Sequence, residues 1–313
     1  MRTKLNIFVY ILIISLLIVG CSQKPIDDAN GNNGDVDVNI VHLTDDMDRE
    51  ISIAEKPQKI ISLSPANTEV LFALNGNDKI VGVTDYCDYP EQVKSIEKIG
   101  DYINPNIEKI ISLEPDLVVA NAEHKEIVET LERLDIPTIV LRPLDMENMF
   151  QNIELVGKAL GEDEYSKELV ESLRERMNDV KSRISGIAET DKPKVYYEIW
   201  YEPLMTAGPG TFIDDLIKLA GGINIAGEAK TSFPEISLEL ILDKAPDIFI
   251  YSHHGDSQME LEEIYERVNW HNIPAIKNRQ IYDIDPNIVQ RATPRLIDGL
   301  EIIAEILHPD LFK

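Results

Sequence analysis

The sequence predicts an α/β fold of two similar lobes with mainly parallel sheets, together with one helix long enough to run from one lobe to the other. Three observations support this. A pattern of helix, Pro-Asp turn and apolar strand occurs at 106–119 and returns at 237–250, with Glu108 and Glu239 at equivalent places 131 positions apart. Strands and helices alternate along most of the chain, which implies mainly parallel sheets covered on both faces. The segment 163–185 has the apolar spacing of a long amphipathic helix.

The N-terminal half is expected to alternate strands with helices. In chain order, the pattern predicts a hairpin at 40–43 and 50–53, a strand at 59–63, a helix at 65–74, a strand at 80–83, the first repeat at 106–119, a helix at 126–134, a strand at 138–141 and a helix at 146–160. Ser64 is a capping residue and Pro65 stands at the first helical position. Residues 84–90 follow the carboxyl end of a predicted strand, where open α/β sheets bind ligands.

The second half repeats this alternation after the long helix. The helix is expected to bury one stripe: Tyr165, Leu169, Leu173, Met177, Val180 and Ile184. A helix of roughly 23 residues spans about 35 Å, enough to run from one lobe to the other. The elements expected next are a strand at 194–200, a loop at 201–210, a helix from 212 that Gly221 and Gly222 stop, the second repeat at 237–250, a helix at 259–268, a strand at 280–284 and a helix at 293–307 capped by Thr293.

The start of the chain is expected to lie outside the lobes. Residues 7–19 are apolar and follow a basic start, but they are shorter than the roughly 20 residues that cross a bilayer, so 1–20 is predicted to be a signal peptide. The residues before Cys21 resemble a bacterial-type lipoprotein signal, which predicts a lipid on Cys21 and a folded part outside the cytoplasm. Residues 21–39, rich in Asp, Asn and Gly, are predicted to be a flexible tether.

Length and composition bound the remaining possibilities. The predicted boundaries are an N-terminal lobe at 40–161, a connecting helix at 162–186 and a C-terminal lobe at 187–313, and 313 residues suffice for two cores. A net charge of −26 opposes nucleic-acid binding, because phosphates require a basic surface. With Cys21 lipidated, Cys87 has no partner for a disulfide and is expected to be a small hydrophobe or an idle thiol.

No catalytic motif is present, and one pair of histidines is the best candidate for metal binding. Nucleophile elbows, phosphate-binding loops and His-Glu-x-x-His motifs are absent from the sequence. Adjacent histidines on an extended segment point to opposite faces, so His253 and His254 favour a solvated loop end over a metal site. An axial contact from one of them to haem or to the cobalt of a corrinoid stays open. No catalytic residue, resident metal or cofactor is predicted.

Aromatic residues gather in loops at the ends of predicted strands or just ahead of predicted helices. The set comprises Tyr86, Tyr89, Tyr102, Trp200, Tyr201 and Phe233. Half-buried packing would explain each one separately. As a set at the sheet edges of two lobes, they favour an apolar cleft for a flat or greasy ligand.

Glu108 and Glu239 have two explanations. Acidic side chains in the first turn of a helix are stabilised by the helix dipole, by roughly 0.3–1 kcal/mol each. Two equivalent carboxylates also suit docking on a partner with two-fold symmetry, which presents the same socket twice. The residues alone leave both explanations open.

Three stretches of the sequence resemble a known family. The motif Ser-Pro-Ala-Asn-Thr-Glu at 64–69, the motif Asp-Tyr-Cys-Asp-Tyr-Pro at 85–90 and the first repeat are similar to the substrate-binding proteins of vitamin B12 and ferric-siderophore ABC importers. The resemblance extends from about residue 40 to the C-terminus and is closest to the vitamin B12-binding proteins. It implies a binding protein with no enzymatic activity, two Rossmann-like lobes with mainly parallel sheets joined by a single long helix at 163–185, and little hinge closure.

The resemblance also implies the aromatic contacts to cargo. The family's corrinoid-contacting tyrosine corresponds to Tyr86, and an aromatic residue of each lobe corresponds to Tyr102 and Phe233. A further family aromatic corresponds to Met205, and Trp200 is the candidate to replace it.

Polar contacts and docking residues follow from the same resemblance. The family's contact loop falls on 287–291, where Arg291 is kept while Asn287 and Ile288 replace an acidic residue and a tryptophan. Backbone groups near Ala66 and Asn67 are expected to meet the polar periphery of the cargo. The family's docking carboxylates, which meet arginines of two permease subunits, correspond to Glu108 and Glu239.

The sequence therefore predicts a lipid-anchored, extracytoplasmic receptor, monomeric when free, that captures cobalamin or a related corrinoid and docks on an ABC permease dimer with its ATPase. A ferric siderophore or haem is the alternative cargo. Anionic catecholate siderophores usually call for several cleft arginines, and only Arg142, Arg291 and Arg295 are positioned for that role, which weakens this alternative without removing it. An extracytoplasmic enzyme is the less favoured alternative.

Overall fold

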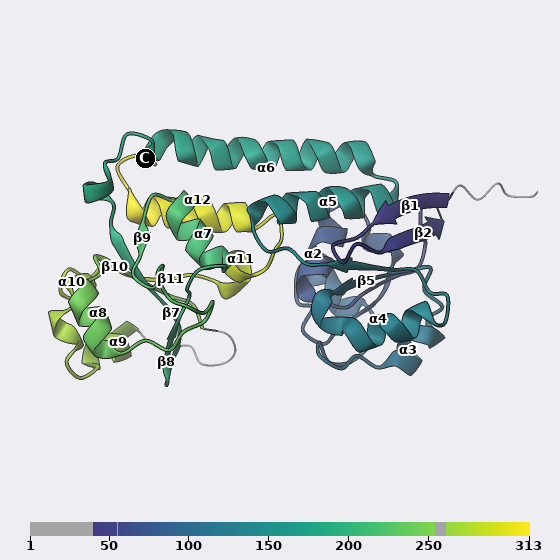
Figure 1. Cartoon of the computed structure of the whole chain (residues 1–313), viewed down its shortest axis with the longest axis horizontal. Coiled ribbons are helices and arrows are strands. Elements are labelled where there is room, and N and C mark those ends of the chain that lie inside the picture. Colours follow the sequence, from purple (N-terminus) through teal and green to yellow (C-terminus); the bar gives the residue numbers. More distant parts are fainter. Residues whose placement is uncertain (1–39, 55, 254–260) are drawn as a thin grey trace, which may run out of the picture. The chain divides into compact units, whose positions relative to one another are not determined.

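The computed structural model describes residues 40–54, 56–253 and 261–313 (Figure 1). Residues 38–313 group into one compact unit that contains two sheets of parallel strands with helices packed on them. The predicted α/β fold with two parallel-sheet lobes is confirmed. The predicted signal peptide, the lipidation site Cys21 and the tether lie outside the described residues.

The N-terminal lobe is built on a sheet in which all strands are parallel, in the order β4-β3-β5-β6. Its elements are β1 (Ile40–Thr44), β2 (Glu50–Ala54), β3 (Ile60–Ser62), α2 (Pro65–Ala73), β4 (Ile80–Val83), α3 (Ile107–Ser112), β5 (Leu117–Asn121), α4 (Lys125–Glu132), β6 (Thr138–Leu141) and α5 (Met146–Leu160). Strands β1 and β2 pair antiparallel, which confirms the hairpin. The β3, β5 and β6 strands are apolar because both faces of a parallel sheet are covered.

The C-terminal lobe follows α6 (Asp163–Ile184) and has the strand order β11-β10-β7-β8, with β9 also paired to β7. Its elements are β7 (Lys194–Tyr201), β8 (Leu204–Thr206), α7 (Phe212–Leu219), β9 (Ile223–Asn224), α8 (Leu238–Lys244), β10 (Ile248–Tyr251), α9 (Leu261–Glu266), α10 (Pro274–Lys277), β11 (Ile281–Asp283), α11 (Pro286–Gln290) and α12 (Leu296–Leu307). Only the pairing of β8 with β7 is antiparallel among the described strands of this sheet.

The long helix α6 packs against α5 and α12 (Figure 1). Its buried face differs from the expected stripe at the N-terminal end, where Ser166 and Val170 are buried and Tyr165 is 41% exposed. The reason is close packing on α5, where a Cβ built on Gly157 would lie 2.2 Å from Ser166 Cβ. Only small residues allow this approach of the two helices, and it turns the neighbouring Tyr165 outward.

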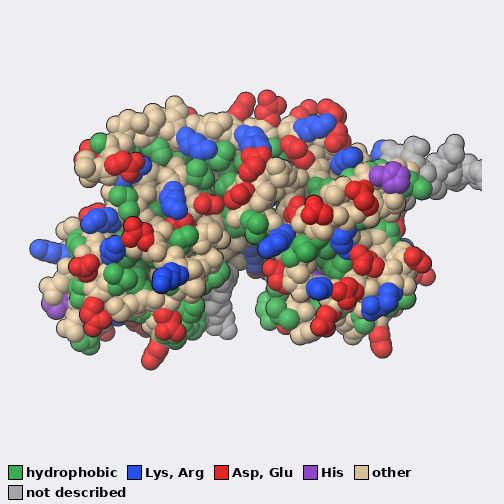
Figure 2. All heavy atoms as spheres, in the orientation of Figure 1, with side chains coloured by type: hydrophobic (Ala, Val, Ile, Leu, Met, Phe, Trp, Pro, Cys, Tyr) green, Lys and Arg blue, Asp and Glu red, His purple; other side chains and the backbone are tan. Residues whose placement is uncertain are grey.

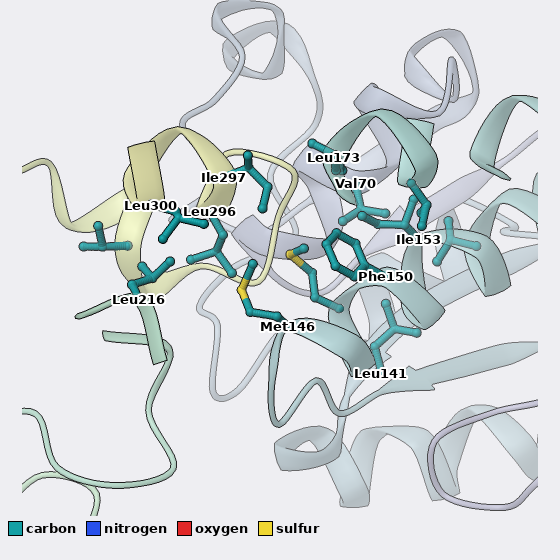
Figure 3. Packing of buried hydrophobic residues seen from close by; sticks show 14 of the residues in the cluster. Val70, Leu141, Met146, Phe150, Ile153, Leu173, Leu216, Leu296, Ile297 and Leu300 are labelled. Atoms are coloured by element: carbon teal, nitrogen blue, oxygen red, sulfur yellow. The ribbon is translucent and has the colours of Figure 1, made fainter. Parts of the chain in front are cut away.

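The largest apolar core includes residues of both lobes. Figure 3 shows side chains of α2, α5 and α6 packed together with those of α7 and α12. Val70, Phe150, Leu173, Leu216 and Leu300 all belong to this one cluster of buried residues. Smaller separate cores cover the other faces of the two sheets. Moving the lobes apart would therefore expose apolar surface, which is unfavourable by about 25 cal/mol per Å².

Two expectations for the C-terminal lobe were wrong, and several short elements were not expected. The predicted loop at 201–210 contains β8, which forms a hairpin with β7. The short helix α11 was not expected. The closing helix begins at Leu296, because Thr293 is fully buried and its hydroxyl accepts a bond from the Arg295 backbone amide in the turn before the helix.

Within the described part of the chain, no helix is both long and apolar enough to cross a membrane. Figure 2 shows acidic and basic side chains interspersed over the face that it draws.

Candidate functional site

Two exposed aromatic side chains lie in loops, one in each lobe. Tyr86 follows β4 and its residue is 59% exposed, while Phe233 is 56% exposed. The segment after Phe233 runs beside β8, with bonds from Thr206 N to Pro234 O and from Ile236 N to Leu204 O. Phe233 is thus held next to the β7–β8 hairpin, and both rings are available to a ligand.

Tyr102, the third predicted aromatic contact, is half-buried against His124. The two rings meet edge to face, with their centroids 5.0 Å apart. Burial, with the negative charge of Glu123 as the next cause, raises the pKa of the Tyr102 phenol. Part of the Tyr102 side chain is therefore buried by packing within the N-terminal lobe.

His124 is held as a neutral imidazole. Its Nδ1 accepts a bond from the Asn121 backbone amide at 3.0 Å, so its Nε2 carries the proton and donates to the Tyr102 carbonyl at 2.8 Å. Burial lowers the pKa of His124 from 6.5. Protonation of Nδ1 would break the bond to Asn121 and disturb the loop that carries Tyr102.

Trp200 and Met205 lie directly opposite each other in the β7–β8 hairpin. Side chains at opposed positions of antiparallel strands share one face of the pair. The Trp200 indole donates to the Glu202 carbonyl at 2.9 Å and its ring centroid lies 5.2 Å from that of Tyr201. The structure thus places Met205, which stands at the family's aromatic position, next to Trp200, the candidate to replace that aromatic.

Ala66 and Asn67 lie in the first turn of α2. Ala66 is half-buried, while Asn67 is buried and its side-chain amide donates to Asn121 Oδ1 at 2.7 Å and to the Val119 carbonyl. The Asn67 backbone amide donates to the Ser64 hydroxyl, which caps the helix as expected. The polar groups of Asn67 are thus used within the lobe, and the half-buried Ala66 is the more accessible of the two residues.

Arg291 stands at the end of α11 and is bound by acidic residues of the N-terminal lobe. Its Nη1 donates to Glu69 Oε1 at 2.9 Å and to Asp88 Oδ1 at 2.6 Å. Arg295 also binds Glu69, with Nε to Oε2 at 2.8 Å and Nη2 to Oε1 at 2.7 Å. We call Glu69, Asp88, Arg291 and Arg295 the interlobe charge cluster. Asn287 lies four residues before Arg291, on α11, and is half-buried. Its backbone amide donates to Asp285 Oδ1.

Arg142, the third predicted cleft arginine, is exposed just after β6, and its backbone amide donates to Asp46. It belongs to no ion pair identified among the described residues.

Glu108 and Glu239 are both exposed in the first turn of their helices. Asn106 caps α3 by accepting from Lys109 N, and Ser237 caps α8 by accepting from Leu240 N. Each carboxylate can therefore be reached by a partner while the helix start below it is already satisfied by its cap.

A buried charged group lies within β7 at a position that sequence reasoning missed. Glu198 is fully buried and receives both terminal nitrogens of Arg267, at 2.6 and 2.7 Å, and the Tyr196 hydroxyl at 3.1 Å. Burial alone would raise the pKa of Glu198, but Arg267 and His253 hold it below its usual value.

The solvated position expected for His253 is wrong. Its side chain is 3% exposed, and its Nε2 lies 3.2 Å from Glu198 Oε1 without the alignment of a hydrogen bond. The rings of Trp200, Tyr201 and Tyr251 surround it at centroid distances of 5.6–6.0 Å. His254 lies outside the described residues.

Two further features concern metals and thiols. No group of three or more His, Cys, Asp or Glu side chains that could hold a metal ion is found among the residues that the structure describes. Cys87 is a buried free thiol whose Sγ lies 3.2 Å from the hydroxyls of Thr68 and Thr84.

Comparison with known proteins gives matches over most of the chain. The family model described as periplasmic binding protein matches residues 60–288. The chain is 30% identical over its full length to an uncharacterized ABC transporter substrate-binding lipoprotein, YvrC, of Bacillus subtilis, and the match covers 100% of that protein.

One further relative and two solved structures are also similar to this chain. The chain is 26% identical to the vitamin B12-binding protein of Vibrio cholerae over 82% of its own length and 92% of that protein. A crystal structure of the V. cholerae vitamin B12-binding protein superposes with a TM-score of 0.69 at 25% identity, over 81% of this chain and 97% of that one. A possible iron-binding solute-binding protein of Staphylococcus epidermidis gives a TM-score of 0.70 at 26% identity, over 81% and 100% of the two chains.

Proposed function

The chain belongs to the periplasmic binding protein family of ABC transporter substrate-binding proteins, and from this premise we propose that its cargo is cobalamin or a related corrinoid. The family is not enzymatic, and the chain is the substrate-binding component of an ABC importer. The observation that carries the corrinoid proposal is the pair of exposed rings, Tyr86 and Phe233, one on each lobe. The similarity to the V. cholerae vitamin B12-binding protein supports it.

A flat macrocycle suits this arrangement because it offers two broad apolar faces. Covering about 100 Å² of an aromatic ring contributes about 2.5 kcal/mol at about 25 cal/mol per Å², or roughly 70-fold in affinity. Trp200 and Met205 would extend the apolar contact on the C-terminal lobe, and Tyr102 would add the exposed part of its ring. Asn287 and the backbone near Ala66 would meet the amide-bearing rim of the ligand.

Anchoring and docking belong to the same proposal. A lipid on Cys21 would keep the receptor at the outer side of the membrane, and the similarity to a substrate-binding lipoprotein supports this. The exposed and equivalently capped Glu108 and Glu239 are proposed to bind the two subunits of a permease dimer.

An iron-containing cargo, either a ferric siderophore or haem, is the second candidate. The similarity to a possible iron-binding protein of S. epidermidis favours it. An axial contact from His253 would require its buried ring to move away from Glu198, whose Oε1 lies 3.2 Å from Nε2.

The deciding experiment is a set of titrations of the purified protein with cyanocobalamin, haemin and ferric siderophores, followed by visible spectra and calorimetry. The corrinoid proposal expects saturable, one-to-one binding of cyanocobalamin that is stronger than that of the iron ligands. Binding of an iron ligand with no detectable cyanocobalamin binding would overturn it.

A further inference from the structure

The interlobe charge cluster leaves the two arginines beside the proposed cargo site without free charge. Glu69 uses both carboxylate oxygens, binding Arg291 through Oε1 and Arg295 through Oε1 and Oε2. Asp88 binds the remaining side of Arg291, at 2.6 Å through Oδ1 and 3.3 Å through Oδ2. Two cations therefore face two anions, and the cluster has no net charge.

The pairing favours the ionised forms of Arg291, Arg295 and Asp88. The side chain of Glu69 is 3% exposed, and those of Arg291 and Arg295 are 16% and 18% exposed. Burial works against both arginines, but the hydrogen bonds to Asp88 and Glu69 outweigh it and raise the pKa of each guanidinium. The Arg291 guanidinium likewise holds the pKa of Asp88 below its usual value, against the effect of burial.

The cluster lies next to the aromatic residues proposed to contact cargo. Asp88 is two residues after Tyr86 in the loop that follows β4, and its side chain is 53% exposed. The next residue, Tyr89, covers Arg295, whose Cζ lies 3.9 Å from the ring centroid. An incoming ligand can thus reach the edge of the cluster, but Tyr89 covers the face of Arg295, and the nitrogens of Arg291 bind Glu69 and Asp88.

We propose that Glu69 determines the charge class of the cargo, by neutralising Arg291 and Arg295 so that the site accepts ligands without net charge and rejects polyanions. This rests on the proposed function, because it concerns the same cargo site. A polyanionic complex would have to separate Glu69 from its arginines, leaving a buried carboxylate unpaired. A neutral macrocycle leaves the pairs intact.

Glu69 stands in a helix whose local sequence offers no other purpose for an acid. In α2 the residues from Asn67 to Leu71 are buried, so position 69 would ordinarily hold an apolar side chain. Its partners are more than 200 positions away in the chain, which sequence spacing cannot indicate.

Glu69→Gln tests the proposal, because it keeps the size of the side chain and removes its charge. The probes are two ferric complexes of similar size, a tris-catecholate with several negative charges and a neutral tris-hydroxamate, with cyanocobalamin measured in parallel. We expect the ratio of the two iron-complex affinities to move at least about tenfold toward the tris-catecholate, and to return toward its original value in 1 M salt, where the Debye length is about 3 Å.

Two companion variants complete the experiment. Glu301→Gln is the control for net charge, because it removes one carboxylate that pairs with Arg176 of α6, away from the cluster. The affinity ratio of this variant should equal that of the unmodified protein. Asp88→Asn frees one side of Arg291 at an exposed position, so it tests the proposal even if Glu69→Gln does not fold, with a smaller shift in the same direction.

The outcomes separate this proposal from the corrinoid proposal. Unchanged ratios in the folded Glu69→Gln and Asp88→Asn proteins would overturn the role of Glu69, whatever cyanocobalamin does. A wild-type protein that already prefers the tris-catecholate would overturn it too. Absence of cyanocobalamin binding, with the expected shift in ratio, would overturn only the corrinoid.

Discussion

The two copies of the repeat agree in their framework and differ where cargo is proposed to bind. Glu114 and Ala245 both adopt left-handed backbone conformations, with φ of 52° and 47°, directly before the proline of the turn. The aspartate after each proline then accepts from backbone amides at or just before the start of a strand in its own lobe. Asp116 binds the amides of Gln58 and Lys59, and Asp247 binds the amide of Lys194.

The aromatic residue ahead of each copy has no such equivalence. Tyr102 is half-buried against His124, whereas Phe233 is largely exposed. The difference indicates that the helix-turn-strand unit is constrained by its backbone hydrogen bonds and by the shared docking role proposed for its first turn. The proposed cargo side of the unit is free to differ between the lobes, because an asymmetric ligand presents different faces to them.

The largest effect is expected when both copies lose their first-turn carboxylate. The double variant Glu108→Ala and Glu239→Ala should reduce transport by at least about tenfold, because truncating one partner of an interfacial ion pair typically costs about 2–5 kcal/mol. Uptake of labelled cargo and calorimetry of the purified receptor measure the two functions separately. Weakened cargo binding would contradict the assignment and move these residues to the cargo site.

The matched control removes two exposed acids from α6, Glu168→Ala and Glu171→Ala, and should leave transport unchanged. The two single docking variants sharpen the comparison, since equal losses are expected if the lobes meet equivalent sockets.

Removing the aromatics should separate the two lobes next. Phe233→Ala is expected to weaken cargo binding by about 10–100-fold with little change in stability, because its exposed ring makes few contacts in the free protein. Tyr102→Ala should instead lower the free energy of unfolding by about 1–3 kcal/mol through lost packing on His124. Ligand titration and urea unfolding measure both quantities, and Tyr165→Ala on α6 is the control. Equal effects of the two variants on stability would contradict the comparison.

The turn aspartates should differ by less. Asp116→Ala removes two hydrogen bonds from a half-buried carboxylate and is expected to lower the free energy of unfolding by about 2 kcal/mol. Asp247→Ala removes one from an exposed carboxylate and should lower it by about 1 kcal/mol. Urea unfolding gives both values, with the exposed Asp243→Ala as control. A larger loss of unfolding free energy for Asp247→Ala than for Asp116→Ala would contradict this ranking.

The smallest effect is a pH dependence confined to the Tyr102 side. Because burial lowers the pKa of His124 below its unfolded value of 6.5, the unfolded state binds a proton first as pH falls. His124 therefore destabilises the fold as pH drops below about 6.5, by at most about 1.4 kcal/mol per unit. His124→Gln should reduce the difference in melting temperature between pH 7 and pH 5.5. The exposed His271→Gln should leave it unchanged, and an equal difference in wild type and His124→Gln would exclude His124 as the cause.

Elements with strong local signals were predictable. The apolar β-branched strands β3, β5 and β6, the Ser64-Pro65 helix start and the long α6 appear where the spacing of apolar residues places them. Errors arose where tertiary contacts overrode local pattern. Tyr165 turns outward because Gly157 brings α5 close to Ser166, and Thr293 is buried in a turn instead of capping α12.

The proposed site was predictable only in part. Tyr86 and Phe233 could be singled out because aromatic residues at strand ends or just ahead of helices can be recognised in the sequence. Both side chains are exposed in the structure. The burial of His253 beside Glu198 could not be predicted from the sequence. Glu198 is paired with Arg267, which is 69 positions away and lies outside β7.

The sequence by itself determined the alternation of strands and helices, the internal repeat and the family, because hydrophobic period, turn residues and motifs act over short distances along the chain. Only the tertiary structure decided which charges meet. Glu69 and Arg291 are 222 positions apart, and a buried ion pair depends on a few ångströms of separation that no local pattern encodes. The repeat that the sequence displays sets the framework twice, while folding alone pairs the arginines beside the proposed cargo site with acids from the other lobe.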